Sequence, residues 1–182
     1  MNLEEKKISE EYIFKGKIIK VRVDDAEVPD GTIHKREVVE HNGGVCVVPV
    51  TDKGEIITVK QFRYPYMEVV KEIPAGKRDG DEEPLKCGVR ELKEETGCTA
   101  ERFEFLGELY PSPGYCGEII YMYAAFGLSY GDTDPDEDEF LLVEKTPIED
   151  LVKEIMRGEI KDAKTQAAVM KTYLLMQKEN EL

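Results

Sequence analysis

The segment GKRDGDEEPLKCGVRELKEETGC, residues Gly76–Cys98, holds an unusual density of carboxylates in a stretch whose pattern predicts a helix. Pro84 suits the first turn of that helix, because its missing N–H would have no intrahelical partner there. At about 100° per residue, four side chains fall within a narrow arc, and we expect this stripe to face the core. Its members are Leu85, Val89, Leu92 and Thr96. The segment therefore predicts an amphipathic helix.

Three glutamates, Glu91, Glu94 and Glu95, cluster on the side of the helix away from this stripe. Gly88, one turn earlier, leaves room for another group to approach. Each pair of like charges three or four residues apart destabilises a helix by roughly 0.2–0.5 kcal/mol, and a divalent cation would reverse that effect. Mg²⁺ takes oxygen ligands, usually a few carboxylates with phosphates and water. The alternative is a hydrated acidic face on which Arg90 pairs with Glu94.

Composition and charge predict a soluble protein of one domain and argue against nucleic-acid and membrane partners. The chain of 182 residues fits one domain, and 41% hydrophobic with 35% charged residues is typical of a soluble globular protein. A net charge of −14 would repel a nucleic-acid backbone, so we expect no nucleic-acid partner. The N-terminal MNLEEKKISEEY has no apolar core, and no later apolar run approaches the roughly 18 residues of a membrane span. We therefore expect a cytoplasmic protein with no membrane partner.

The cysteines support the same compartment. The chain has four, and none of them forms a Cys-x-x-Cys pair. This usage indicates a reducing compartment with buried or incidental thiols. They are Cys46, Cys87, Cys98 and Cys116.

Strand patterns precede and follow the helical segment. GKIIKVRVDDAEV and TIHKREVVEH flank PDG, whose proline and glycine suit a tight turn, so residues 16–41 predict a β-hairpin. GGVCVVPVT is apolar enough to be a buried central strand, and GEIITVKQFRY follows it across DKG. Further strands are expected at residues 102–110 and 118–128, and helices from Pro147 to Arg157 and from Ala163 to Lys178. These elements predict a mixed β-sheet with flanking helices.

The spacing within the opening segment resembles the Nudix box. Gly76 is followed after five residues by Glu82, and after seven more by RELKEETGC, which begins at Arg90. This resemblance implies an α/β fold of the Nudix type, an α/β/α sandwich around a mixed β-sheet. It also implies an N-terminal antiparallel β extension at residues 1–41, which serves dimerisation, ahead of a hydrolase domain at residues 42–182. The partner would then be a second copy of the chain, giving a homodimer.

Stretches outside the box resemble the ADP-ribose pyrophosphatase branch of that family. They are QFRYP, EIPAG, YPSPGYCGE, DPDEDEFL and IKDAKTQAAV, and Pro113 lies 15 residues beyond Cys98, about where the branch carries a diagnostic proline. The resemblance implies Mg²⁺-dependent hydrolysis of ADP-ribose, a small nucleoside diphosphate derivative, to AMP and ribose 5-phosphate, with Mn²⁺ as a substitute metal. The alternatives are a nucleotide-sugar pyrophosphatase, acting for example on GDP-mannose, and a non-catalytic regulator that binds ADP-ribose.

The resemblance also implies roles for the box residues. Glu91 and Glu95 match metal ligands, with the backbone carbonyl of Ala75 as a further ligand. Glu94 is a further ligand or a supporting catalytic residue, and Arg90 orients the carboxylates through ion pairs. Structural support is expected from Gly76, Glu82 and Gly97.

Four residues outside the box are expected at the substrate. Arg63 and Arg36 match arginines that hold phosphate or the terminal ribose, since a guanidinium fork suits both. Pro113 is included because it lies about where the branch carries its diagnostic proline. Glu118 lies where relatives often carry an acidic residue, and its role is left open.

The acidic run DTDPDEDE, residues 132–139, resembles the loop that folds over the site in this branch. Glu137 matches the carboxylate that activates the attacking water, and Glu139 matches a metal ligand. This division is chemically sensible, because water beside a divalent ion has a lowered pKa and needs only a nearby base. Asp136 and Asp138 remain alternatives for these roles.

Overall fold

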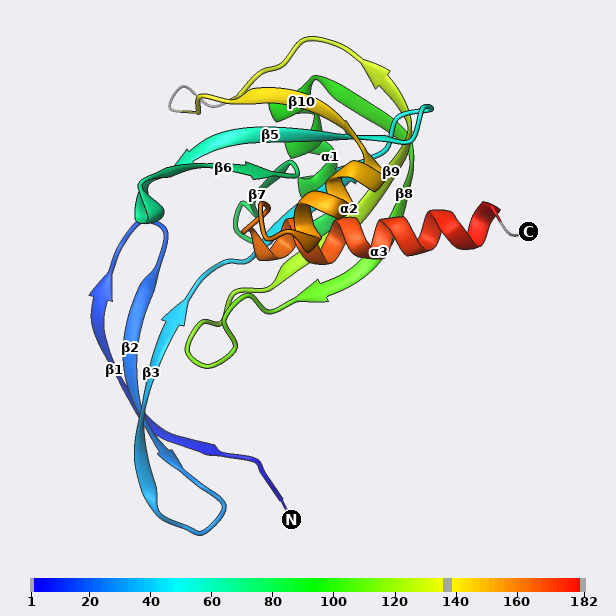
Figure 1. Cartoon of the computed structure of the whole chain (residues 1–182). Helices are drawn as coiled ribbons and strands as arrows, with labels where there is room; N and C mark the ends of the chain where they lie inside the picture. The colour runs from blue at the N-terminus through cyan, green and yellow to red at the C-terminus, as the bar shows by residue number, and fades with distance from the viewer. Residues whose placement is uncertain (1, 136–138, 181–182) are drawn as a thin grey trace. The chain divides into compact units, whose positions relative to one another are not determined.

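The computed structural model describes residues 2–135 and 139–180 (Figure 1). The chain divides into two compact units, Met1–Gly43 with Tyr110–Ile119, and Gly44–Leu109 with Ile120–Leu182. The boundary expected between residues 41 and 42 stays a prediction. No helix among the described residues is long and apolar enough to cross a membrane.

The first unit is an antiparallel sheet of three strands. Its strands β1 (Lys6–Lys15), β2 (Lys20–Glu27) and β3 (Ile33–Glu40) follow one another in space as in sequence. The predicted hairpin is β2–β3, and its turn is closed at PDG, where Asp30 accepts hydrogen bonds from the backbone N–H and the hydroxyl of Thr32. The segment Tyr110–Ile119 joins β3 through hydrogen bonds in which Val39 N donates to Tyr115 O and Gly117 N donates to Val39 O.

The second unit contains two sheets. A mixed four-stranded sheet has the order β7 (Ala75–Lys77), β4 (Gly44–Pro49), β9 (Ile120–Tyr130), β8 (Cys98–Leu109), in which β4 and β9 are parallel. An antiparallel sheet has the order β10 (Leu142–Pro147), β5 (Glu55–Arg63), β6 (Glu68–Glu72), and a 3₁₀ turn at Tyr64–Tyr66 joins β5 to β6. The helices are α1 (Pro84–Thr96), α2 (Ile148–Met156) and α3 (Ala163–Asn180).

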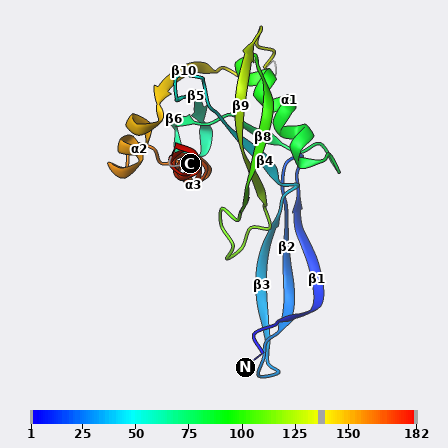
Figure 2. The same ribbon diagram turned by 90° about the vertical axis from the view of Figure 1, so that its right-hand side faces the viewer.

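Strand β4 is the centre of the second unit, because all six of its residues are buried. Val45 and Val47 pack into a core beneath α1 with Leu92 and Cys98. Cys46 and Val48 point the other way into a core that α2 and α3 cover. Figure 2 shows α1 and α3 on opposite sides of β4, β8 and β9. The predicted α/β/α sandwich with a buried central strand is therefore confirmed, and all four cysteines are free thiols.

Candidate active site

Helix α1 begins where Pro84 predicts. Pro84 occupies the first turn, and the Glu83 carboxylate caps the helix by accepting a hydrogen bond from Leu85 N at 3.3 Å. Gly97 ends the helix with a φ of 70°, and its N–H donates to Lys93 O at 2.8 Å. A methyl group on Gly97 would lie 2.2 Å from the carbonyl oxygen of Gly131, so the position also requires the absence of a side chain.

The buried face of α1 differs from the predicted one. Val89, expected in the core, is 41% exposed, whereas Glu91 is 9% and Glu95 only 3% exposed. Leu92 and Thr96 are buried as expected. The prediction for Val89 was wrong because it followed the apolar residues alone and not the strands that α1 packs against. In the fold two of the three glutamates face inward, so α1 buries charge together with apolar surface.

Gly88 brings α1 close to the central strand. A methyl group at this position would lie 3.0 Å from a Val45 methyl carbon and 3.2 Å from one of Val47. Gly88 thus leaves room for another group to approach, as expected, and that group is strand β4. Close packing of helix on strand at Gly88 sets the depth of the glutamates that follow.

The carboxylates of Glu91 and Glu95 lie against strand β7. A methyl group on Gly76 would lie 1.9 Å from Glu91 Cδ, so the missing side chain of Gly76 is the space that the Glu91 carboxylate occupies. Ala75 N donates to Glu95 Oε2 at 3.2 Å. Hydrogen bonds to β4 fix β7, with Cys46 opposite Ala75. Helix and strand together therefore place two carboxylates beside the backbone of Ala75 and Gly76.

These two buried carboxylates hold protons unusually strongly. Burial raises the pKa of Glu91 to about 7 and that of Glu95 to about 8. The charge of Glu91 adds to the effect on Glu95, and Glu139, which precedes β10, lies near enough for its charge to raise the pKa of both. Burial outweighs the positive charge of Arg90 at Glu91 and of Arg63 at Glu95, and a bound cation would further favour the ionised forms.

Arg90 holds the outer part of this group. Its Nη1 donates to Glu91 Oε1 and to Glu94 Oε2, both at 2.8 Å, and its Nε and Nη2 donate to the two oxygens of Glu82 at 3.2 and 3.0 Å. Nη2 also donates to Lys77 O at 3.2 Å. The Arg90 guanidinium lowers the pKa of Glu82 to about 2. Glu82 further accepts from Asp79 N at 3.2 Å, so it ties the loop before α1 to Arg90.

The carboxylate and carbonyl oxygens of this site are suited to a hard divalent cation. The oxygens of Glu91, Glu95 and Glu139 and the carbonyl of Ala75 are the ligand types that such ions take. In the part of the chain that the structure describes, no three acidic, histidine or cysteine side chains are already arranged around one ion position. Arg90 engages only Oε1 of Glu91, so the other carboxylate oxygen can ligate an ion while this ion pair is kept.

A charged network that the sequence analysis did not assign lies at the end of β6. Glu72 is 2% exposed and accepts from Arg63, with Nε to Oε1 at 2.6 Å and Nη2 to Oε2 at 2.8 Å. Lys164, in the first turn of α3, donates to the same Glu72 oxygen, and it also pairs with Asp162 at 2.9 Å. Of these residues only Arg63 is expected at the site from sequence, although EIPAG and IKDAKTQAAV, which hold Glu72 and Lys164, are among the stretches that resemble the branch.

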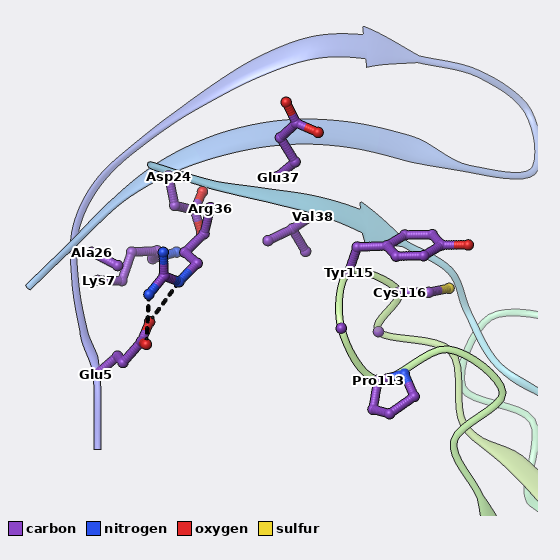
Figure 3. A pocket seen from close by; sticks show the side chains of 12 residues that line it. Glu5, Lys7, Asp24, Ala26, Arg36, Glu37, Val38, Pro113, Tyr115 and Cys116 are labelled. Carbon is purple, nitrogen blue, oxygen red and sulfur yellow. Dashed lines mark hydrogen bonds and ion pairs between the residues drawn. The ribbon is translucent and has the colours of Figure 1, made fainter. Parts of the chain in front are cut away.

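Arg36 and Pro113 line one pocket of about 330 Å³ in the first unit (Figure 3). Glu5 holds the Arg36 guanidinium through two hydrogen bonds, at 2.8 Å to Nε and 2.7 Å to Nη2. The pocket walls come from β1, β2, β3 and the segment Tyr110–Ile119. Asp24 also lines it, is 5% exposed, and has one carboxylate oxygen without a hydrogen-bond partner.

The predicted site residues fall into two groups. The second unit brings together the box carboxylates, Arg90, Ala75 and Arg63. The first unit holds Arg36, Pro113 and Glu118, and Glu118 lies 3.3 Å from His41 Nδ1. Glu137, with the alternatives Asp136 and Asp138, lies outside the described residues.

Models of two known protein families match the chain. The NUDIX domain model matches residues 40–169, and the model of the nucleoside diphosphate sugar hydrolase N-terminal domain matches residues 5–39. The chain belongs to the Nudix family. It is a Nudix hydrolase, and hydrolases of this family depend on divalent metal ions.

Two relatives and one solved structure illustrate the similarity. The chain is 46% identical over 170 residues to an ADP-ribose pyrophosphatase of Bacillus subtilis (strain 168), a match that covers 92% of each chain. It is 42% identical to a methanol dehydrogenase activator of Bacillus methanolicus, over 96% of this chain and 94% of the other. The fold matches the crystal structure of an ADP compounds hydrolase with a TM-score of 0.86 at 20% identity, over 100% of both chains.

Proposed function

We propose that this Nudix hydrolase cleaves the diphosphate bond of ADP-ribose with Mg²⁺ and gives AMP and ribose 5-phosphate. The observation that carries the proposal is the buried pair Glu91 and Glu95 against Ala75 and Gly76, with the Arg63 guanidinium nearby in the same unit. The 46% identity to an ADP-ribose pyrophosphatase supports the choice of substrate.

Glu91, Glu95, Glu139 and the carbonyl of Ala75 would hold Mg²⁺ or, as a substitute, Mn²⁺, with Glu94 as a further or supporting ligand. When bound, the metal neutralises the diphosphate and lowers the pKa of nearby water. The fold supports this assignment because Glu91 and Glu95 are buried with raised pKa values, so a cation would stabilise their ionised forms. Arg90 keeps the outer carboxylates in position through its contacts with Glu82 and Glu94.

The chain's own residues carry the proton and bind the substrate. Glu137 takes a proton from the attacking water as the water oxygen forms a bond to one phosphorus. The bond from that phosphorus to the bridging oxygen breaks, and the bridging oxygen leaves with the other phosphate. Arg63 donates hydrogen bonds to the diphosphate, since its Nη1 has no hydrogen-bond partner among the described residues.

Arg36 and Pro113, which line the pocket of the first unit, are proposed as substrate-binding residues. Glu118 is proposed as a third, although it does not line that pocket. We also propose that the protein is a cytoplasmic homodimer in which residues 1–41 pair with a second copy. Support for the dimer comes from the resemblance of this extension to that of the branch, whose N-terminal strands pair.

Hydrolysis by the purified protein with Mg²⁺ tests the proposal. ADP-ribose, GDP-mannose and ADP-glucose are compared at equal concentration, and products are separated by chromatography. We expect AMP and ribose 5-phosphate from ADP-ribose at the highest kcat/KM. Preference for GDP-mannose or ADP-glucose would favour the nucleotide-sugar alternative instead.

A matched pair of variants links the activity to the site. Glu95→Gln should abolish turnover, because it removes a charge from the buried pair and keeps the shape of the side chain. Glu149→Gln, at an exposed position in the first turn of α2, is the control and should leave turnover unchanged. Near-normal activity of Glu95→Gln at saturating Mg²⁺ would show that the metal assignment is wrong.

A regulatory role is the second candidate, and it is favoured by the 42% identity to a methanol dehydrogenase activator. The purified protein would then raise the rate of a methanol dehydrogenase. Glu95→Gln separates the two roles, because an activator that needs no hydrolysis would keep its effect in that variant.

A further inference from the structure

The carboxylate of Glu72 is buried between two cations of the second unit. Its side chain is 2% exposed, yet it accepts both hydrogen bonds of the Arg63 Nε–Nη2 edge and one from Lys164. Burial by itself would raise the pKa of Glu72, but Arg63 and Lys164 outweigh it and lower that pKa. Glu72 is therefore ionised, and Arg63 and Lys164 together balance its charge.

Lys164 is fixed from the other side by the start of α3. Its side chain is 12% exposed, and Asp162 pairs with it at 2.9 Å. The other oxygen of Asp162 accepts from Thr165 N at 2.9 Å and from Thr165 Oγ1 at 2.6 Å. Thr165 Oγ1 in turn accepts from Ile73 N at 3.0 Å, which ties α3 to the residue after Glu72. The ammonium group of Lys164 is thus held in one place.

Arg63 has a different environment, because it lies at the end of β5 and its side chain is 38% exposed. Glu72 takes the Nε–Nη2 edge, so the guanidinium orientation is set and Nη1 is left without a hydrogen bond to the described residues. The charge of Arg63 reaches Glu95, one of the two buried carboxylates of α1. Arg63 therefore keeps donors on Nη1 that Glu72 does not use, and its charge lies near enough to act on Glu95.

We propose that Lys164 is a positioning residue for substrate binding, which acts through Glu72 on the Arg63 guanidinium and so fixes the donors that take the diphosphate. The inference rests on the proposed function in that it assigns the diphosphate to Arg63. With Lys164 present, Glu72 is neutralised from behind and is held where it can orient Arg63. Without Lys164, Glu72 has one cation left, and the pair can shift toward solvent, where both charges are hydrated.

The test compares binding and turnover in Lys164→Met. Binding of ADP, which carries the diphosphate, is measured by isothermal titration calorimetry in MgCl₂, and kcat and KM are measured with ADP-ribose. We expect the Kd for ADP and the KM for ADP-ribose to rise about tenfold with kcat within about threefold of wild type, the pattern of lost ground-state binding. Lys164→Arg should restore most of the affinity, since it keeps the cation.

Lys161→Met is the matched control. Lys161 lies three residues earlier, is 65% exposed, and pairs with exposed Glu68 at 2.8 Å. It carries the same change of charge at the same helix end without contact to Glu72. We expect its Kd and KM to equal those of wild type.

A double-variant cycle separates positioning from a general structural role. If Lys164 acts through Arg63, Lys164→Met should add no further rise in Kd or KM to Arg63→Ala. A merely structural role of Lys164 would give independent effects, or a loss of kcat with unchanged KM. Either of those results, or unchanged ADP binding in Lys164→Met, would overturn the proposal.

Folding and the proposed function are checked separately. Circular dichroism shows whether Lys164→Met is folded. If it is not, Lys164→Gln replaces it, because glutamine keeps a donor for Glu72 but loses the charge. The same rise in the Kd for ADP and the KM for ADP-ribose is then expected. Wild-type protein that binds ADP but leaves ADP-ribose intact would overturn the proposed function, and the ADP titrations would still decide the role of Lys164. Wild-type protein that binds no ADP would overturn both.

Discussion

Replacing Gly76 by alanine tests whether the Glu91 carboxylate must lie in the space that this glycine leaves. The new methyl carbon would lie 1.9 Å from Glu91 Cδ and 2.0 and 2.2 Å from its two oxygens. Backbone strain is not involved, because Gly76 does not have a positive φ. The side chain of Glu91 is therefore the group that has to move.

The size of that movement gives the expected loss. An ordinary contact between carbon atoms is about 3.5 Å, so the Glu91 carboxylate must shift by about 1.6 Å from its 1.9 Å position. A misplacement of about 1 Å at a reacting group costs up to about 10²-fold in rate. We expect Gly76→Ala to lower kcat/KM for ADP-ribose by about 10²-fold, which corresponds to about 2.7 kcal/mol of transition-state stabilisation.

The assay is steady-state hydrolysis of ADP-ribose at saturating Mg²⁺, with circular dichroism melting to confirm that the variant is folded. Glu91→Ala provides the control background, because it removes the atoms that the new methyl group would meet. Gly76→Ala should therefore cost nothing further in Glu91→Ala. Full activity of the single variant, or an equal loss in both backgrounds, would refute the reasoning.

Three further predictions concern pH, the acidic loop and assembly. In metal-free protein the pKa values of about 7 for Glu91 and about 8 for Glu95 lie above the ordinary 4.5, so the folded chain binds more protons than the unfolded chain. The melting temperature should therefore fall as pH rises from 4.5 to 8, and Mg²⁺ should restore it. A melting temperature that rises over this pH range in calorimetry would contradict the assignment. Glu137→Gln should lower kcat by about 10²–10⁴-fold with little change in the Mg²⁺ requirement, whereas Glu139→Gln should raise the Mg²⁺ concentration that activity needs. Reversed phenotypes in a Mg²⁺ titration would show that the loop is aligned two residues out of register. Light scattering at micromolar concentration should give the mass of a homodimer, and a monomeric mass would exclude that assembly.

Local sequence was enough to predict many of the elements. Pro84 and Gly97 mark the ends of α1, because proline lacks an N–H and glycine readily adopts a left-handed conformation. The apolar run GVCVVP predicts the buried strand β4, and PDG predicts the turn between β2 and β3. The spacing from Gly76 to Glu95 is also local, so the resemblance to the Nudix box could be recognised from sequence.

Sequence did not predict which face of α1 is buried. A helical wheel sorts residues by angle, and its apolar stripe predicts Val89 in the core and Glu95 on the side away from it. The fold reverses both, because β7 and the missing side chain of Gly76 provide a place for acidic groups beside backbone N–H. Burial of a charge depends on partners that lie elsewhere in the chain.

The network of Arg63, Glu72 and Lys164 shows the same limit over a longer distance. Glu72 and Lys164 are separated by 92 residues, and each taken alone is an ordinary charged residue. Only the packing of α3 beside the end of β6 makes them a buried ion pair that orients Arg63. The sequence by itself thus determined the helix and strand segments and the acidic box, since these depend on neighbours along the chain. The tertiary structure decided which charges are buried and paired, because desolvation and ion pairing depend on neighbours in space.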